Sequence, residues 1–485
     1  MPSKTHLTDY LREHARLTPN KLAVVTTSKT LTWSELATRV EAGAAHISDQ
    51  IKGHCDEQQI IALLMPNTWQ YVVAYLSIVH AGHMAMPIDV IFKPLEIEAV
   101  LNQVPPVLLI TDEAGAARVN KGMVDVIGVE DFPTEAPPGV ADYLRLPADK
   151  QVACLFFTSG TTGKPKVVPN THANHIWNIE TCSKVWNWTS SDSQLTSVRL
   201  SHMLGLVMGL SGTLYHGSTM YLQERFIAED TLKILASGKI TMFSHGPLVY
   251  AQLLKAPNRR KYNLSRIRLF ISGSAPLSPS VWQEFKSVFG AEILEVYGST
   301  ETGRITSNLL DERIPGSPGY ALPGVDIKLS KHGEVLVKSP GVFPGYWRNP
   351  IATKKSLTID GFWRTGDVGE FKDDRLILRG RTQEIIRKKG YSISPRDIEW
   401  ALHKAPDINE VFVMGLMNPD SPDDQIIYFI VGQISPRPLH DFCAANLPSI
   451  WRPDRIIKLD RLPRTSSGKP ELAKLKAMAE KSGGD

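Results

Sequence analysis

The amino-acid sequence predicts an α/β protein with a large N-terminal domain and a small α+β C-terminal domain. Short apolar runs rich in β-branched residues alternate with longer amphipathic stretches between residues 60 and 296. Strands separated by helical segments of this length form βαβ units in mostly parallel sheets. Residues 313–346 are instead rich in Gly and Pro, and residues 381–485 mix helix with apolar strands. These changes of pattern predict a β-rich unit followed by a separate small domain.

The alternation has two blocks, one over residues 60–110 and one over residues 219–296. In the first block we expect strands at Ile60–Met65, Met84–Ile88 and Val107–Ile110, with helices at Thr68–His80 and Pro94–Gln103. In the second block, the expected strands are Thr219–Leu222, Ile240–Phe243, Ile267–Ile271 and Glu292–Val296, and the expected helices are Glu229–Ala236, Pro247–Leu254 and Ser278–Phe289.

The β-rich unit is expected over residues 313–379, as a small antiparallel or barrel-like structure. Its predicted strands include Asp326–Leu329 and Glu334–Val337. We place the domain boundary near Arg379–Gln383, which gives an N-terminal domain of residues 1–380 and a C-terminal domain of residues 381–485. The C-terminal domain is predicted to contain the helix Pro395–His403 and the strands Val411–Gly415 and Ile426–Val431.

Composition excludes several classes of protein. The formal net charge of +4 over 485 residues argues against dense neutralisation of nucleic-acid phosphates. A hydrophobic content of 42% excludes wholesale disorder, no apolar run is long enough for a membrane span, and residues 1–20 are too polar for a signal peptide. The four cysteines, Cys55, Cys154, Cys182 and Cys443, are far apart and suit a reducing compartment. We therefore expect a soluble, cytoplasmic protein.

The segment Leu155–His172 is the most informative stretch for function. A strand-like run, Ala153–Phe157, leads into a loop rich in Gly, Ser, Thr and Lys. Glycines let backbone amides turn toward one point, hydroxyls add donors, and lysines offset phosphate charge. The loop is not a P-loop of the GxxxxGK[ST] kind. The residues predicted to cradle phosphate are Thr158, Ser159, Gly160, Thr161, Thr162, Gly163 and Lys164.

Read with the segments that follow it, this loop resembles the phosphate loop of the adenylate-forming (AMP-binding) superfamily, which includes acyl-CoA synthetases. The similarity runs from about residue 20 to residue 475, and some segments read like malonyl-CoA synthetases. The other segments that carry the resemblance occur in the family's order: Leu31–Leu36, His80–Asp89, Tyr297–Glu301, Gly333–Tyr346, Trp363–Asp367, Gly380–Glu399 and Pro463–Lys469.

The resemblance implies ATP-dependent activation of a carboxylic acid to an acyl-adenylate, with release of pyrophosphate. Lys469 corresponds to the lysine that bridges the attacking carboxylate and the α-phosphate, and Glu301 to the carboxylate that holds Mg²⁺. Thr300 corresponds to the α-phosphate contact. Asp367 is expected to bind both ribose hydroxyls, because a carboxylate can accept two hydrogen bonds at once. The remaining nucleotide-binding residues implied are Tyr297 stacked on adenine, Gly298, Ser299, Arg381, and Gly273, Ser274, Ala275 and Pro276 in the loop after a strand.

Three positions depart from the family pattern without removing a catalytic group. Val167 replaces a glycine at the end of the phosphate loop, and Trp451 stands where a smaller or hydrophilic residue is usual. Gln383 occupies the hinge position that is usually Asp or Lys. The resemblance implies that the C-terminal domain is mobile and pivots at this hinge.

The acyl pocket is expected to include His202, Gly205, Leu206, Val296 and Gly298. No Asp for binding an α-ammonium group lies in the segment that starts at Ser201, so a standard α-amino acid is disfavoured. Val296 stands where malonyl-CoA synthetases carry an Arg, and an apolar residue cannot offset a second buried carboxylate. We therefore expect a monocarboxylic acid, aliphatic or aromatic. The apolar side chains expected to form either a tunnel or core packing are Leu204, Leu206, Val207, Met208 and Leu210.

The acceptor of the acyl group is less constrained. Gly390 corresponds to the glycine beside the pantetheine passage, which suits coenzyme A. A carrier-protein pantetheine arm ranks second and an amine third. A nucleotide-binding protein without turnover remains the alternative of another class, although Lys469 and Glu301 are both present. The sequence has neither a P-loop nor the set of Asp residues typical of a kinase, which argues against a simple ATPase or kinase.

Overall fold

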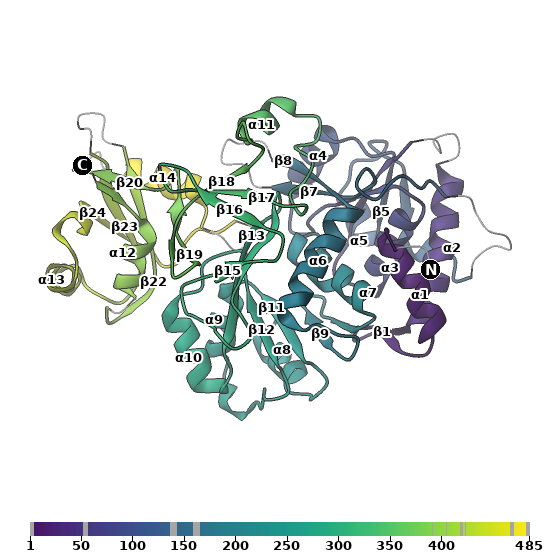
Figure 1. Cartoon of the computed structure of the whole chain (residues 1–485), viewed down its shortest axis with the longest axis horizontal. Coiled ribbons are helices and arrows are strands. Elements are labelled where there is room, and N and C mark those ends of the chain that lie inside the picture. Colours follow the sequence, from purple (N-terminus) through teal and green to yellow (C-terminus); the bar gives the residue numbers. More distant parts are fainter. Residues whose placement is uncertain are drawn as a thin grey trace.

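The α/β fold is confirmed by the computed structural model of the chain. The structure describes residues 4–51, 57–135, 143–158, 165–389, 391–403, 405–417, 421, 423–465 and 470–481, without the side chain of residue 392. Figure 1 shows a large lobe that contains the N-terminus and a smaller lobe that contains the C-terminus, at opposite ends of the long axis.

The first half of the large lobe is built on a six-stranded sheet in the order β6-β5-β3-β4-β7-β8. All neighbouring strands are parallel except β7 and β8, which are antiparallel. The phosphate loop of the sequence therefore connects the two strands of a hairpin. The elements of this part are β3 (Ile60–Leu64), α3 (Trp69–His80), β4 (Met84–Pro87), α4 (Pro94–Gln103), β5 (Leu108–Thr111), α5 (Glu113–Ala116), β6 (Val126–Gly128), η1 (Val129–Asp131), β7 (Val152–Thr158) and β8 (Lys166–Thr171).

The second half is a nine-stranded sheet in the order β15-β14-β13-β12-β11-β9-β10-β1-β2. Its middle strands are parallel, whereas β14, β15 and β2 pair antiparallel with their neighbours. The strands are β1 (Leu22–Val25), β2 (Thr30–Thr32), β9 (Ser193–Thr196), β10 (Thr219–Leu222), β11 (Met242–His245), β12 (Leu269–Ser272), β13 (Ile293–Ser299), β14 (Gly303–Ser307) and β15 (Tyr320–Ala321).

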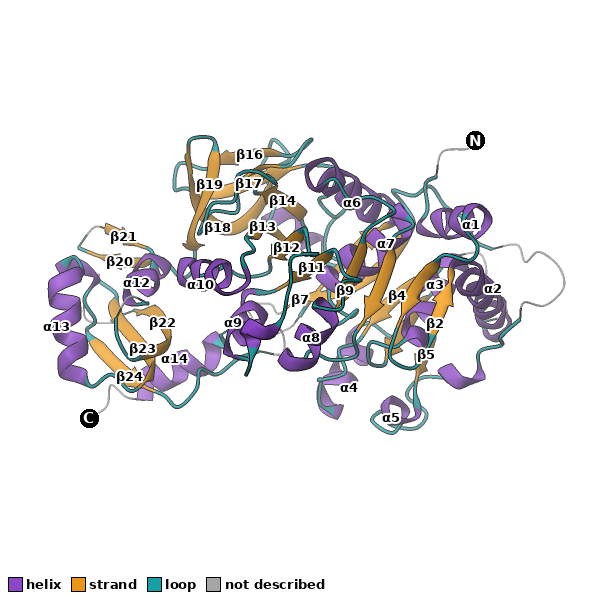
Figure 2. Cartoon of the chain, turned by 90° about the horizontal axis from the view of Figure 1, so that it is seen from below, coloured by secondary structure: helices purple, strands orange, loops and turns teal. Residues whose placement is uncertain are grey.

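Helices cover this sheet and fill the space between the two sheets. Helices α8, α9 and α10 lie together beside the nine-stranded sheet, as both ribbon views show (Figure 1, Figure 2). The helices are α1 (Leu7–Leu17), α2 (Trp33–Gln50), α6 (His172–Trp186), the π-helix η2 (Leu204–Ser211), α7 (Gly212–His216), α8 (Ala228–Leu235), α9 (Pro247–Lys255), η3 (Arg259–Lys261) and α10 (Pro279–Phe289).

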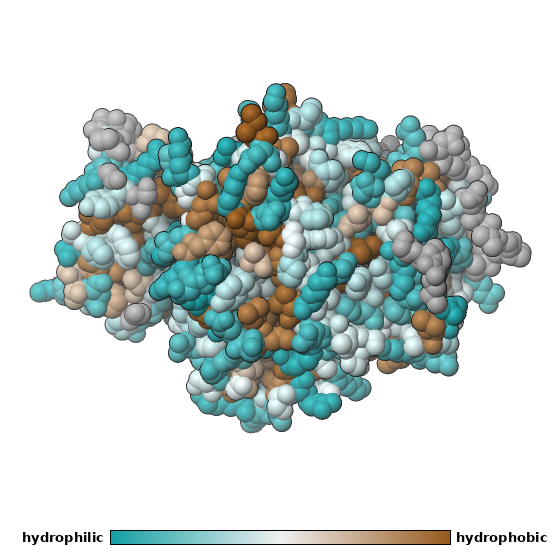
Figure 3. Space-filling view, viewed as in Figure 1, coloured by the Kyte–Doolittle hydropathy of each residue, from teal (hydrophilic) through white to brown (hydrophobic). Residues whose placement is uncertain are grey.

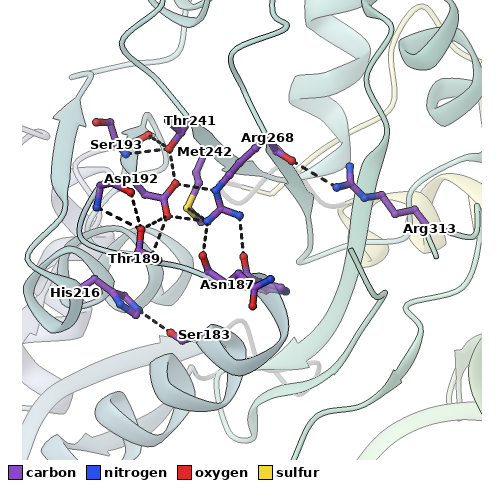
Figure 4. A network of polar contacts seen from close by, with 12 residues as sticks. Ser183, Asn187, Thr189, Asp192, Ser193, His216, Thr241, Met242, Arg268 and Arg313 are labelled. Atoms are coloured by element: carbon purple, nitrogen blue, oxygen red, sulfur yellow. Dashed lines mark hydrogen bonds and ion pairs between the residues drawn. The ribbon is translucent and has the colours of Figure 1, made fainter. Parts of the chain in front are cut away.

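A network around Arg268 ties helix α6 to the nine-stranded sheet. Arg268 forms an ion pair with the buried Asp192 at 2.7 Å and donates to the carbonyls of Trp186 and Asn187 at 2.8 and 3.0 Å (Figure 4). Thr241 donates to the same Asp192 at 2.7 Å. Because α6 ends where these carbonyls lie, the network fixes the helix against the strands that lead into the site.

The predicted β-rich unit is a four-stranded antiparallel sheet in the order β16-β17-β18-β19. Its strands are β16 (Asp326–Leu329), β17 (Glu334–Lys338), β18 (Trp363–Lys372) and β19 (Arg375–Arg381), and α11 (Pro350–Lys355) lies between the second and third. Strand β19 continues through Gly380 to Arg381, so the start that we predicted for the C-terminal domain is the last residue of this sheet.

The small lobe has hydrophobic clusters of its own, centred on Ile398, Tyr428 and Phe429. It contains a two-stranded sheet and a three-stranded sheet. The elements are β20 (Ile386–Lys388), β21 (Tyr391–Ile393), α12 (Pro395–Leu402), β22 (Ile408–Leu416), β23 (Gln425–Gly432), α13 (Pro436–Asn446), η4 (Ser449–Trp451), β24 (Arg455–Lys458) and α14 (Leu472–Lys481). The domain boundary and the mobility of this lobe stay predictions.

The face seen in Figure 3 is mostly polar, with hydrophobic residues gathered in the middle of the view and also at its top, over α11, where Ile351 is 70% exposed. Across the described ranges, no helix combines the length and hydropathy needed to cross a lipid bilayer.

Candidate active site

Three of the residues predicted to bind ATP meet where strand β13 approaches the four-stranded sheet. Tyr297 lies near the end of β13, is 8% exposed, and donates its hydroxyl hydrogen to Asp367 Oδ2 at 2.7 Å. Asp367 pairs with Arg381 across β18 and β19, and Arg381 Nε lies 3.2 Å from Asp367 Oδ1. Burial and the Asp367 charge raise the pKa of Tyr297 well above its usual value, so the phenol stays a donor. The carboxylate keeps further acceptor positions for other hydroxyls.

The turn after β13 holds Glu301 beside the flank of the phosphate loop. Tyr346 donates its hydroxyl hydrogen to Glu301 Oε1 at 3.1 Å, and the amide of Phe343 donates to the Glu301 carbonyl at 2.8 Å. Lys166 Nζ lies 4.7 Å from the centre of the Tyr346 ring. Ser299 accepts from the amide of Thr302 at 3.3 Å, which shapes the turn around Thr300. Lys166, Tyr346 and Glu301 thus form a continuous polar path.

The residues present fit a magnesium ion that shares its ligands with a nucleotide. Mg²⁺ is usually held by one or two carboxylates together with substrate phosphates and water. Glu301 offers a partly exposed carboxylate at the turn. No cluster of three or more metal-binding side chains occurs among the residues that the structure describes. The arrangement suits an ion that arrives with ATP, and not a metal cage made by the protein alone.

Several predicted residues lie outside the described ranges. They are Ser159, Gly160, Thr161, Thr162, Gly163 and Lys164 of the phosphate loop, Lys469, Gly390, and Cys55 among the cysteines. The flanks of the loop are described: Thr158 donates its hydroxyl hydrogen to the carbonyl of Lys166 at 3.4 Å, and Gln103 donates to the carbonyl of Pro165 at 2.7 Å.

The loop after β12 carries the next predicted group, Gly273 to Pro276. Gly273 is buried, and its amide donates to the carbonyl of His245 at 3.2 Å. A Cβ atom on Gly273 would stand 2.8 Å from Val296 Cγ2, so a side chain there would displace the wall that Val296 forms. Ser274 has a φ of 71°, and Ser274, Ala275 and Pro276 are exposed. The loop therefore presents backbone toward the end of β13.

The predicted acyl segment starts a buried π-helix. His202 is partly exposed, and its carbonyl accepts from the amide of Leu206 at 2.9 Å. Gly205 is needed for close packing, because a Cβ atom there would lie 2.4 Å from the carbonyl oxygen of Arg199. Burial, with Arg199 and His202 nearby, lowers the pKa of His245 to about 3. Of the two arrangements expected for the apolar side chains of this segment, the structure agrees with core packing. The main hydrophobic core includes Leu204, Leu206, Val207, Met208 and Leu210.

The predicted hinge, Gln383, lies in an exposed turn between β19 and β20. The amide of Thr382 donates to the carbonyl of Gly366 at 2.8 Å, and the amide of Glu384 donates to the carbonyl of Arg381 at 2.8 Å. Arg379, just before the turn, pairs with Asp397 of α12 at 2.9 Å. The turn is therefore the point at which the chain passes from one lobe to the other.

The sequence alone gave no role to Tyr346, and it pointed to Arg304 only as a cation that could pair with a second carboxylate of the acid. Tyr346 lies in a segment that resembles the family, but its contact with Glu301 spans 45 positions. Arg304 lies directly after the Tyr297 motif, and its amide donates to Asn178 Oδ1 of α6 at 2.7 Å.

The fold and these contacts define a nucleotide-binding enzyme of the adenylate-forming ligase class. The chain belongs to the AMP-binding enzyme family: the family's sequence profile matches residues 11–347, and the profile of its C-terminal domain matches residues 397–469. It is 30% identical over 472 residues to a mitochondrial malonate–CoA ligase of Mus musculus, covering 85% of this chain and 80% of that one. It is 28% identical to a long-chain-fatty-acid–CoA ligase of Bacillus subtilis, covering 97% and 93%. The crystal structure of ATP-bound MatB from Rhodopseudomonas palustris superposes with a TM-score of 0.90 at 27% identity, covering 98% of this chain and 99% of that chain.

Proposed function

We propose that this protein is an AMP-forming acid–CoA ligase, which activates a carboxylic acid with ATP and transfers the acyl group to coenzyme A. The observation that carries the proposal is the meeting of Tyr297, Asp367 and Arg381 at the end of β13, next to the Glu301 turn. The names of its relatives support the same reaction, because they include ligases that join malonate or fatty acids to coenzyme A.

In the first step, a carboxylate oxygen of the acid attacks the α-phosphorus of ATP, and the bond to the departing pyrophosphate breaks. Asp367 would accept hydrogen bonds from the ribose hydroxyls, and Arg381 would hold Asp367 in place. Thr300 and Lys469 would donate to the α-phosphate, where negative charge repels the incoming carboxylate. Mg²⁺ bound at Glu301 would offset phosphate charge. The loop from Thr158 to Lys164 would hold the outer phosphates.

In the second step, the thiol sulfur of coenzyme A attacks the acyl carbon, AMP leaves, and the thiol proton is lost. Gly390 would leave room for the thin pantetheine arm. His202, at the start of the π-helix, would stand between the reacting carboxylate and the incoming thiol. The C-terminal domain from residue 381 would rotate about Gln383 between the two steps, because one geometry cannot both exclude water around ATP and admit a thiol.

The nature of the acid and of the acceptor belongs to the same proposal. The apolar Val296 offers no charge to a second carboxylate, which supports a monocarboxylic acid, aliphatic or aromatic, although a related enzyme is named for malonate. A carrier-protein thiol and an amine remain the second and third acceptors. A cytoplasmic location is also proposed, and the mitochondrial relative is the reason to test it by fractionation.

The proposal is tested by acid-dependent release of pyrophosphate from ATP across a panel of carboxylic acids. A ligase releases pyrophosphate only with its acid, and then forms acyl-CoA and AMP in equal amounts when coenzyme A is added. ATP hydrolysis to ADP, or binding of ATP without any acid-dependent turnover across the panel, would contradict the proposal. Replacement of coenzyme A by hydroxylamine or by a carrier protein separates the acceptors.

A further inference from the structure

Arg304 lies on the wall of the predicted acyl pocket. It stands opposite Gly298 in the antiparallel pair of β13 and β14. Residues paired in this way share one face of a sheet, and successive residues alternate between faces. Gly298 and Val296 are two positions apart and share a face. The register shifts between Tyr297 and Gly298, with Ile305 as the extra residue of β14, and the pairing with Gly298 still places Arg304 beside the two pocket residues.

The tip of the Arg304 side chain reaches the strand next to β13. A Cβ atom on Gly273 would lie 3.9 Å from Arg304 Nη1 and 2.8 Å from Val296 Cγ2. Arg304 also lies close enough to Cys182 of α6 to act on the pKa of that thiol, which burial raises to about 12 and the guanidinium lowers in part. The guanidinium thus lies between α6, the Gly273 loop and Val296, with its Nε buried, while Arg304 as a whole stays partly exposed.

This guanidinium has no counter-charge within the part of the chain that the structure describes. Its Nε is buried without a hydrogen-bond partner, no ion pair involves it, and burial lowers its pKa. By comparison, Arg268 pairs with Asp192, and Arg313, whose Nε is also buried without a partner, donates from its two Nη atoms to the carbonyls of Glu292 and Arg268 at 2.7 and 3.5 Å (Figure 4). A buried charge without a partner is costly, so a ligand group is the natural partner here.

We propose that Arg304 binds an oxygen acceptor on the tail of the acid, at the end away from the reacting carboxylate. This inference rests on the proposed function. The acceptor is either the carbonyl of an oxo acid or the carboxylate of a short dicarboxylic acid, because a guanidinium donates to both. Arg304 would thereby supply, from β14, the positive charge that Val296 does not supply from β13.

The test compares acids of matched length in the pyrophosphate-release reaction: pentanoate, 4-oxopentanoate and glutarate, and then hexanoate, 5-oxohexanoate and adipate. We expect the oxygenated acids to have the higher kcat/KM in the wild type. Arg304→Met keeps the length of the side chain but removes its donors, so the preference for the oxygenated acid should fall by about 10- to 100-fold. Arg304→Lys should restore part of it. Preference for 4-oxopentanoate identifies a neutral acceptor, and preference for glutarate an anionic one.

Arg313→Met is the matched control, because it removes a half-buried guanidinium that donates to two backbone carbonyls. It should lower the thermal unfolding temperature without changing the ratio between matched acids. Wild-type preference for the hydrocarbon acids, or an equal loss for all acids in a folded Arg304→Met, would overturn the inference. If Arg304→Met does not fold, the wild-type ratios and Arg304→Lys decide. Failure of every acid to release pyrophosphate would instead count against the proposed function.

Discussion

In the protein without nucleotide, the carboxylate of Asp367 already contacts two side chains. It accepts from Tyr297 at 2.7 Å and pairs with Arg381 at 3.2 Å. A carboxylate offers about four lone-pair positions, so two remain for ribose hydroxyls. Tyr297 is 8% exposed in this arrangement, and its ring presents little free surface for stacking. At the scale of single residues, the hydrogen bonds of Asp367 are therefore the sharper test of the nucleotide site.

Asp367→Asn keeps the size of the side chain but loses its charge and one acceptor. We expect the KM for ATP to rise by about 10- to 100-fold, the usual range for lost hydrogen bonds to a charged group. Pyrophosphate release at saturating acid measures it. Tyr297→Phe, which removes only the hydroxyl, is the control and should change the KM far less. An unchanged KM for ATP in Asp367→Asn would remove Asp367 from the ribose site.

Lys469→Ala tests the proposed contact with the α-phosphate. Loss of one donor to a developing charge costs on the order of 10²–10³ in rate, so acid-dependent pyrophosphate release should fall by that factor. Thioester formation from preformed acyl-adenylate should change much less. Lys474→Ala is the matched control, since Lys474 is an exposed lysine of the same lobe that pairs with Glu471 at 2.8 Å. Near-normal pyrophosphate release by Lys469→Ala would contradict the assignment.

At the scale of helices and strands, polar strand ends explain most differences between the predicted and observed bounds. Pro94–Gln103 is confirmed as predicted, because proline marks its start. Strand Ile240–Phe243 is observed as Met242–His245, and Glu292–Val296 as Ile293–Ser299. Both observed strands continue into polar residues, where a pattern of apolar residues gives no signal. These polar ends carry residues of the candidate site, so the predicted strands stopped short of it.

The sequence could not predict how distant segments meet. The contact between Tyr346 and Glu301 depends on a turn and a loop from different sheets. The π-helix Leu204–Ser211 is buried all round, so its apolar residues follow no helical face that a pattern could reveal. Motif residues such as Tyr297 and Asp367 could be proposed from the sequence, because the chemistry expected of them restricts residue type and order.

Helix α12 carries an acid whose ionisation should weaken the small lobe. Glu399 accepts from the amide of Val413 at 2.8 Å, and burial raises its pKa from 4.5 to about 8. The folded state then holds a proton that the unfolded state has lost, so stability falls as the pH rises from 4.5 to about 8. Glu399→Gln cannot ionise and should lose this dependence. Urea unfolding followed in both proteins at pH 5 and pH 8, about the two ends of this range, measures it.

Glu41 supplies a control of opposite sign in the large lobe. The hydrogen bond with His80, despite partial burial, lowers the pKa of Glu41 from 4.5 to about 2. Its contribution is therefore present above pH 4.5 and is lost as the pH falls through about 2. Glu41→Gln should reduce the loss of stability on acidification without affecting the range above neutrality. If the free energy of unfolding of Glu399→Gln changes with pH between pH 5 and 8 as much as that of the wild type, Glu399 is already ionised in the folded protein.

At the scale of the whole molecule, an ion pair and a close packing contact join the described parts of the two lobes near the hinge. Arg379 of β19 pairs with Glu370 at 2.6 Å within its own sheet and with Asp397 of the small lobe at 2.9 Å. Gly316 of the large lobe lies beside Trp400 of α12, since a Cβ atom there would stand 3.4 Å from the indole ring. Contacts of this kind hold one orientation while leaving rotation possible, because partly exposed ion pairs contribute little free energy.

Gln383→Pro tests the rotation itself. Proline fixes φ near −65° and restricts the residue before it, here Thr382, whose amide donates to Gly366. A rotation absorbed by a few backbone torsions should then be blocked. We expect pyrophosphate release to survive, since Asp367, Glu301 and Tyr297 lie in the large lobe, and acyl transfer to coenzyme A to fail. Gln383→Ala keeps the backbone torsions free and should change the rates of both half-reactions very little. If Gln383→Pro slows both half-reactions equally, or slows neither of them, the pivot lies elsewhere.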